Sequence, residues 1–537
     1  MKKPIFYCLL LAPFFGVFTS CAPTLQLISV PEIPVIETTE DRRADENAVY
    51  ELLEKKFTFP NTVQSANYYP QWRAIATNFK TEDRGPSYGI LDLETEQLRW
   101  ANRGNYDFSL LQKEVGLVEF EGKKVLIDAQ TALPIRWVNQ EEFVVIDDSI
   151  TLKMDDNFSK VDLRTGQTHW TRRGGGRYDG WMTDELDGDW MYVIANDLHG
   201  FNLKSGQGWR YAAQTDYDAS NGGRGFANIL LFGLNVANAV YGTGFIDDFG
   251  YLPPKRAHNV NSKPKIDGSL LYFADRASIA CLDKTTGRQQ WKQRLPEEIG
   301  VSSIYKIKDQ RLLLVSKGYR YVNYMMEKDE VPSLYYLDSE DGEIIRRQSL
   351  RKGEVIIDVA LNDAFIYVVT NQKVYRFDHR LKTQKSIELP PSEGGLMRVI
   401  AWSSSRYDET LDSDYPEFPL VIRTEEGLLA LHPVTLEKLW SRWLGRPLKE
   451  MPQMVTTDRW QRPIFLDEID RRRSWVDEQL EVFWFAKDRT IVGVDLLRQG
   501  ETVSEFVLES DAFSYVGNGT LFHFWDNHMA LLQLNAQ

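Results

Sequence analysis

Cysteine and histidine are the residue types in this chain best suited to catalysis or metal binding. Their spacing favours neither catalysis nor metal binding. Cys8, Cys21 and Cys281 form no vicinal pair and no Cys-x-x-Cys motif. The seven histidines include no His-Glu-x-x-His. His523 and His528 are five residues apart, an offset that places side chains on opposite faces of one strand. The spacing therefore predicts no catalytic residue, no cofactor-binding residue and no metal ligand.

Three further segments contain residue types that occur in binding or reactive sites, but their sequences do not follow the motifs of such sites. Residues 338–343 are acidic, but they do not follow the EF-hand pattern, so we expect a turn. Residues 173–177 read Arg-Gly-Gly-Gly-Arg without the Lys-Ser or Lys-Thr of a phosphate-binding loop, so we expect a loop between strands. Cys281 directly precedes Leu282 and Asp283 in an apolar stretch, where we expect it to be buried.

Cys21 is the cysteine whose surroundings indicate a chemical role. Lys2 and Lys3 precede an apolar run over 5–18, which ends close to Ser20 and Cys21, as in a secretory signal peptide. The segment resembles the lipobox of bacterial lipoproteins, whose cysteine becomes the lipidated first residue of the mature protein. The resemblance predicts a signal peptide over 1–20 and lipid attachment at Cys21.

The residues after Cys21 are rich in Pro, Thr and Glu, a composition that predicts a flexible tether over 21–57. Ala22, and not Asp, follows the cysteine, which favours an outer-membrane protein on the periplasmic side. The chain has 77 acidic and 63 basic residues and a formal charge of −14. That charge argues against nucleic-acid binding.

A repeat runs through the rest of the chain and must position any functional residue. Its pattern is an apolar residue, then Asp, then Thr or Ser three residues after the Asp, often Gly, and Trp about eight after it. Six copies carry the Trp, at Asp92, Asp128, Asp162, Asn202, Asp283 and His432. Four weaker copies lack it, at Asp338, Asp378, Asp495 and Asn535.

The repeat has a physical explanation. Alternating residues before each Asp predict a strand, and the Asp side chain accepts hydrogen bonds from the backbone of the turn that it opens. His432 is expected to replace Asp as this hydrogen-bonding residue. Each unit then forms a small antiparallel sheet that cannot bury its own faces, and a ring of such sheets buries them, with Trp covering the neighbouring unit.

The pattern over Leu282–Trp291, Leu-Asp-x-x-Thr-Gly-x-x-x-Trp, resembles the repeat of pyrroloquinoline-quinone-type β-propellers. This resemblance implies an all-β fold, a β-propeller of four-stranded antiparallel blades over 58–537. Eight blades are most usual in that family, and up to ten units can be counted. Its quinone-dependent enzymes would be expected to carry a vicinal cysteine pair, which this chain lacks, so we expect no quinone cofactor and no enzyme activity.

One interval between repeats, from Asn202 to Asp283, is nearly twice the usual spacing. It contains an uncharged, mostly apolar stretch over 226–245. We expect an insert over about 211–262 that includes a helix near 226–241 and packs on the ring, or else docks a partner or the membrane surface. The ring is expected to close without this insert.

The leading functional hypothesis is a lipid-anchored, non-catalytic scaffold that binds protein partners at the bacterial outer membrane. With its lipobox, the chain resembles the propeller lipoproteins of the outer-membrane β-barrel assembly machinery, which implies a role in envelope assembly. One alternative is a surface propeller that binds a glycan or peptide, for which the candidate residues are Tyr319, Tyr321, Tyr324 and Asp329. A quinone-dependent dehydrogenase is the other alternative. The partner, the oligomeric state and the blade number stay open.

Overall fold

The computed structural model describes residues between 37 and 536. The ranges outside the description are 1–36, 44–49, 81–87, 103–106, 121–122, 139–141, 155–156, 174–181, 196, 213–261, 308–309, 323–324, 328–329, 363, 390–399, 403–418, 424–426, 444–473, 478–481, 488, 497–499, 510–512, 518 and 537.

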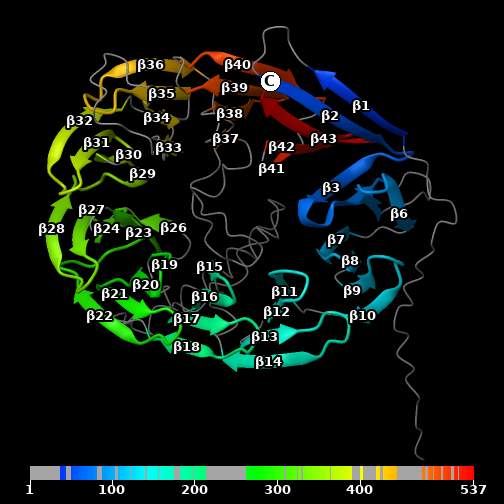
Figure 1. The fold of residues 1–537 in the computed structure, drawn as a ribbon, viewed down its shortest axis with the longest axis horizontal. Helices are drawn as coiled ribbons and strands as arrows, with labels where there is room; N and C mark the ends of the chain where they lie inside the picture. Colours follow the sequence, from blue (N-terminus) through cyan, green and yellow to red (C-terminus); the bar gives the residue numbers. More distant parts are fainter. Residues whose placement is uncertain are drawn as a thin grey trace, which may run out of the picture.

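Ten antiparallel sheets stand around a central axis as the blades of a β-propeller (Figure 1). In blades 1 to 9 the four strands follow one another in sequence from the inner strand to the outer strand. Blades 1 to 3 are β3 (Val63–Tyr69), β4 (Ala74–Phe79), β5 (Tyr88–Asp92) and β6 (Gln97–Asn102); β7 (Asp107–Gln112), β8 (Val115–Phe120), β9 (Lys123–Asp128) and β10 (Pro134–Trp137); and β11 (Glu142–Val145), β12 (Thr151–Met154), β13 (Asn157–Val161) and β14 (Thr168–Arg173).

Blades 4 to 6 continue the same order, and blade 6 carries an additional hairpin, β25–β26, between its second and third strands. Their strands are β15 (Met182–Asp187), β16 (Trp190–Ala195), β17 (Asp197–Asn202) and β18 (Gly208–Tyr211); β19 (Lys265–Asp267), β20 (Leu270–Ala274), β21 (Ser278–Asp283) and β22 (Gln289–Arg294); and β23 (Ser302–Ile307), β24 (Arg311–Ser316), β25 (Arg320–Val322), β26 (Met325–Glu327), β27 (Ser333–Asp338) and β28 (Ile344–Ser349).

Blades 7 to 9 complete the part of the ring that is continuous in sequence. Their strands are β29 (Ile356–Leu361), β30 (Phe365–Thr370), β31 (Lys373–Asp378) and β32 (Thr383–Glu388); β33 (Ile400–Trp402), β34 (Leu420–Arg423), β35 (Gly427–Leu431) and β36 (Lys438–Trp443); and β37 (Ser474–Asp477), β38 (Val482–Lys487), β39 (Thr490–Asp495) and β40 (Thr502–Val507).

Blade 10 closes the ring because it combines the two ends of the chain. From the inside outwards it contains β41 (Phe513–Gly517), β42 (Thr520–Trp525), β43 (His528–Ala536), β2 (Tyr50–Thr58) and β1 (Glu37–Arg43). The ladder between β2 and β43 runs from Tyr50 opposite Ala536 to Thr58 opposite His528. Strand β1 then pairs with the outer side of β2.

This closing arrangement changes the expected domain boundary. Range 21–57 has the composition of a tether, but within it β1 and most of β2 are strands of blade 10. The polar residues of β1 occupy the outermost position of the sheet, where little apolar surface is needed, which is why composition alone concealed the strand.

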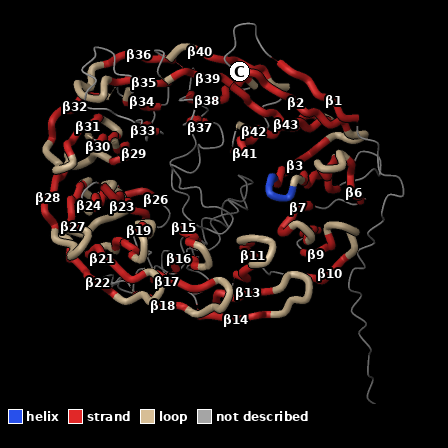
Figure 2. The backbone as a smooth tube through the Cα atoms, in the orientation of Figure 1, coloured by secondary structure: helices blue, strands red, loops and turns tan. Residues whose placement is uncertain are grey.

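The all-β propeller is confirmed, and the blade number is ten, not the eight most usual for the repeat. Each of the ten units counted in the sequence corresponds to one blade, including the four copies without Trp. The only helix in the described part of the chain is the 3-10 turn η1 (Pro70–Trp72), beside β3 (Figure 2). The helix expected near 226–241 lies outside the described residues. No helix among the described residues is long and apolar enough to cross a membrane.

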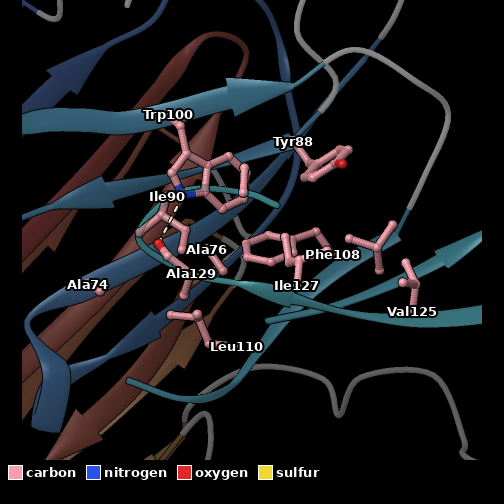
Figure 3. Close-up of a cluster of buried hydrophobic side chains, with 12 residues drawn as sticks. Ala74, Ala76, Tyr88, Ile90, Trp100, Phe108, Leu110, Val125, Ile127 and Ala129 are labelled. Atoms are coloured by element: carbon pink, nitrogen blue, oxygen red, sulfur yellow. Dashed lines mark hydrogen bonds between the residues drawn. The ribbon is translucent and has the colours of Figure 1, made fainter. Parts of the chain in front are cut away.

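The hydrophobic core is divided into clusters that lie between neighbouring blades. One cluster combines Tyr88 and Trp100 of blade 1 with Phe108 and Ile127 of blade 2 (Figure 3). The aromatic rings in it meet edge-on or tilted, with centroids 5.4–5.8 Å apart. A blade thus buries its faces only against its neighbours, so the stability of each blade depends on a closed ring.

Because β2 holds the ring closed, core substitutions on it should destabilise the whole propeller. Phe57 is fully buried between blades 10 and 1 with Val63, Phe522 and Met529. We expect Phe57→Ala to lower the free energy of unfolding by about 3–5 kcal/mol in chemical denaturation. Leu53→Ala on the same strand is the control, since Leu53 is exposed, and it should cost much less. Equal effects of the two variants would contradict this role of β2.

Candidate functional site at the blade interfaces

The repeat Asp opens the turn between the third and outer strands of a blade. In blade 5, the Asp283 carboxylate accepts hydrogen bonds from the backbone N–H of Thr286 at 2.8 Å and from its hydroxyl at 2.8 Å. Gly287 follows with φ of 68°, a conformation that glycine adopts without steric cost. The hydrogen bonds from Thr286 hold the pKa of Asp283 below its ordinary value. The carboxylate is thus occupied by its own turn.

The same hydrogen bonds recur around the ring, as the sequence predicts. Asp128, Asp162 and Asn202 each accept from the backbone N–H groups of their turns. In blade 8 the ring nitrogen Nδ1 of His432 accepts from the backbone N–H of Val434 at 3.1 Å and of Thr435 at 3.2 Å. The prediction that His432 replaces Asp as a hydrogen-bonding residue is therefore confirmed.

Where it is present in the interface, the repeat Trp joins its blade to the turn of the next one. Trp291 in blade 5 donates from Nε1 to the backbone carbonyl of Ser339 in blade 6 at 3.0 Å. Its ring also covers Gly342, where an added Cβ would lie 2.5 Å from the ring. Trp100, Trp170 and Trp209 donate in the same way to Ala129, Leu203 and Lys284 of the following blades.

Blade 2 departs from this pattern. The sequence repeat was expected to place Trp137, nine residues after Asp128, in the interface position, but Arg136, eight residues after Asp128, stands there, opposite Leu126. Arg136 donates from Nε to the carbonyl of Leu163 in blade 3 at 2.9 Å and lies over Gly166. Trp137 is 37% exposed on the outer strand. The assignment of Trp137 to the interface was therefore wrong. Blades 1, 3, 5 and 8 have the same bulge and place the residue eight after the repeat Asp or His in the interface, whereas Trp137 is the ninth residue after Asp128.

Blades 4 and 5 touch directly although residues 213–261 separate them in sequence. The hydrogen bond from Trp209 to the Lys284 carbonyl is 2.9 Å long, and the Tyr211 hydroxyl donates to Gln289 at 3.1 Å. Lys284 also forms an ion pair with Asp187. The interface between these blades is thus formed by the same residues as elsewhere in the ring.

The other residues singled out in the sequence either have a structural role or lie outside the described residues. Cys281 is fully buried between Tyr272 and Trp291, and burial raises the pKa of its thiol to about 12. Asp338 and Asp341 accept backbone hydrogen bonds within their turn, as expected. Range 173–177 lies largely outside the described residues, and Cys21 lies wholly outside them.

His523 and His528 are arranged differently from the expectation for a single strand. A turn at 526–527 separates them, and both rings contact Trp525, at centroid distances of 4.3 and 5.2 Å. His523 is buried, with Nε2 3.9 Å from the carboxylate of Glu54 on β2. Burial and the Lys56 ammonium lower the pKa of His528. No group of three or more metal-binding side chains occurs in the described part of the chain.

One protein-family model matches the sequence of about one third of the ring. Residues 275–453 match the family model of the outer membrane protein assembly factor BamB. The repeats resemble those of BamB. The matched range runs from the end of blade 5's second strand to blade 8, and it therefore includes the Trp291 interface and the His432 turn.

Two solved structures give more distant likenesses. The BamB crystal structure from Moraxella catarrhalis is 12% identical, with a TM-score of 0.36, and covers 73% of this chain and 96% of its own. A KlHsv2 variant, in which a Gly-Ser linker replaces loop 6CD, is 11% identical, with a TM-score of 0.26, and covers 62% of this chain and all of its own. No curated protein sequence matches the chain. Ten blades follow from the strand pairing of this chain itself.

The Trp291 contact generates a prediction. We expect Trp291→Ala to lower the free energy of unfolding by about 3–5 kcal/mol, because a large ring leaves the core and the Ser339 carbonyl loses its donor. Gly342→Ala should also be destabilising, because its Cβ would clash with Trp291. Gly353→Ala is the matched control: its φ of 89° is also positive, but no heavy atom lies within 4 Å of the added Cβ. An equal loss of stability in both glycine variants would show that backbone strain at positive φ, and not the contact with Trp291, causes the destabilisation.

Proposed function

We propose that this chain is a lipid-anchored, non-catalytic scaffold that binds protein partners at the periplasmic side of the bacterial outer membrane. The observation that carries the proposal is the match of residues 275–453 to the model of an outer membrane assembly factor. Assembly of outer-membrane proteins is the process in which such a scaffold acts. The lipid anchor is proposed at Cys21, after a signal peptide over 1–20.

The chemistry of the repeat supports a binding role over a catalytic one. The residues best suited to acid–base or hydrogen-bonding chemistry, such as Asp283 and His432, are engaged by the backbone of their own turns. Cys281 is buried and its thiol pKa is raised, which keeps it protonated at neutral pH. A rigid ring with its reactive groups engaged internally serves to present surfaces to other proteins.

The insert over about 211–262 is proposed to contribute to partner binding. Because blades 4 and 5 already contact each other through Trp209 and Tyr211, deletion of 222–245 should preserve the β-sheet circular dichroism spectrum and most of the melting temperature. We expect the deletion to reduce recovery of outer-membrane assembly proteins after crosslinking of intact membranes and affinity purification. Unchanged recovery would contradict a binding role for the insert, and global unfolding would identify the segment as part of the ring.

The proposed anchor is tested separately from the partner. We expect Cys21→Ala to move the protein from the membrane fraction to the soluble periplasmic fraction, because the thiol that receives the lipid is lost. Cys281→Ala is the control, since Cys281 is buried within blade 5, and it should stay with membranes. A Cys21→Ala protein that remains wholly membrane-bound would contradict lipid anchoring.

A further inference from the structure

The turn between the third and outer strands of blade 8 differs from the usual repeat at two positions. His432 stands where the other nine repeats carry Asp or Asn, and Leu436 stands where blade 5 carries Gly287. Leu436 has φ of 57°, a left-handed conformation that is unfavourable for a leucine. The hydrogen bonds that close this turn must therefore offset strain in its backbone.

These hydrogen bonds require one protonation state of His432. Its Nδ1 accepts from the backbone N–H groups of Val434 at 3.1 Å and of Thr435 at 3.2 Å. Because a backbone N–H group can only donate, Nδ1 must carry a lone pair and the imidazole must be neutral. A protonated imidazole has an N–H group at both nitrogens and can accept neither bond. The turn is thus closed by a group that stops accepting when it takes up a proton.

The aspartate turns respond differently to acid. The backbone and hydroxyl hydrogen bonds of their own turns hold the pKa of Asp162 and the pKa of Asp283 below the ordinary value. These carboxylates therefore remain acceptors at mildly acidic pH. Imidazole is the side chain whose charge ordinarily changes near neutral pH, and His432 is partly exposed to solvent. Among the ten repeats, blade 8 alone has such a group at this position.

The same turn holds blade 8 against blade 7. The Tyr367 hydroxyl of blade 7 donates to the backbone carbonyl of Pro433 at 3.0 Å. The Leu436 side chain is buried in the apolar cluster that these two blades share. Contact between the two blades therefore depends on the conformation of the turn, since both Pro433 and Leu436 belong to it.

Blade 7 has no Trp to strengthen this contact. Lys385 lies opposite Arg376, in the register position that Trp291 has in blade 5. Its ammonium is 3.8 Å from the carboxylate of Glu437. Both side chains are exposed, and an exposed ion pair contributes little to stability. The interface between blades 7 and 8 thus lacks the indole that joins blades 5 and 6.

We propose that His432 makes the interface between blades 7 and 8 sensitive to pH. Protonation of Nδ1 removes both acceptor bonds, opens the turn and separates Pro433 and Leu436 from blade 7. The closed turn takes only the neutral imidazole, whereas the open turn accepts the proton freely, so the closed state loses stability as the pH falls. Turns that use Asp or Asn stay closed, so mild acid opens the ring at one defined interface.

A few other titratable side chains approach this turn among the described residues. They are Tyr367, His379 and Lys385 of blade 7 and Glu437 and Lys438 of blade 8. His379 reaches the turn indirectly: its Nε2 lies 3.0 Å from the Asn362 carbonyl, and the Asn362 amide donates to the Tyr367 hydroxyl. A charged ring still donates to a carbonyl, so protonation of His379 leaves its hydrogen bond intact.

The test measures amide hydrogen exchange of the full chain by mass spectrometry at about pH 8 and about pH 5, on either side of the ordinary histidine titration near 6.5. Each rate is divided by that of an unstructured peptide at the same pH, which removes the direct effect of pH on exchange. The amides of Val434 and Thr435 report the His432 turn. The Thr286 amide, which donates to Asp283, reports an aspartate turn in the same sample.

We expect protection of the Val434 and Thr435 amides to fall about tenfold or more between about pH 8 and about pH 5. Protection of the Thr286 amide should change by less than about twofold, because its acceptor is a carboxylate. His432→Asp and His432→Asn each supply an acceptor at both pH values, and both should abolish the loss at 434–435. His379→Gln keeps a donor toward Asn362 and should leave the loss unchanged.

Both His432 variants are expected to fold, because Asp or Asn occupies this position in the other nine repeats. Equal protection of 434–435 at the two pH values in the unmodified chain would overturn the proposal. A loss that persists in both His432 variants, or that disappears in His379→Gln, would also overturn it, because another group would then be the sensor. An equal loss at Thr286 would show that acid opens the whole ring and not this interface.

Discussion

The ladder between β2 and β43 is the constraint on which the rest of the structure depends. Every blade buries its faces against two neighbours, so a ring with one open interface exposes two apolar faces at once. The closing blade prevents this by pairing Tyr50–Thr58 with His528–Ala536. The turn that follows β2 is attached to the same blade, where the backbone N–H of Phe59 donates to the Asn527 carbonyl at 2.8 Å. The first and the last strands that the structure describes are thereby fixed at one position on the ring.

The interfaces that follow blades 1, 2, 3, 4, 5 and 8 share a direction. A residue on the outer strand of one blade contacts the turn of the following blade, as Trp291 does with Ser339 and Gly342. Arg136 shows that the position tolerates a different chemistry, because a guanidinium can also donate to the carbonyl and lie over the glycine. In these blades the position is filled by a flat group with a donor, and indole and guanidinium both provide it.

Much of this architecture could be predicted from the sequence. Each of the ten units counted in the sequence corresponds to a blade, since Asp, Thr and Gly at fixed offsets report a turn that is local in sequence, but the choice between eight and ten blades had stayed open. His432 was assigned correctly for the same reason. Two features were missed. The strand β1 has the composition of a tether and becomes a strand only through its distant partner β2. Arg136 holds the interface position because it is eight residues after Asp128, whereas Trp137 is one residue too far along the chain. The functional surface could not be located, because binding surfaces leave no fixed spacing in a single sequence.

The closing blade also determines when the chain can finish folding. Strands β1 and β2 are made first, but β43, the partner of β2, is made only after the strands of the other nine blades. Strand β2 must therefore remain unpaired while the other blades form, and the final step joins segments separated by nearly the whole chain. During that interval β2 exposes Phe57 and a free edge to any other strand nearby, so chaperones that hold unfolded chains have a defined target on this chain before the ring closes.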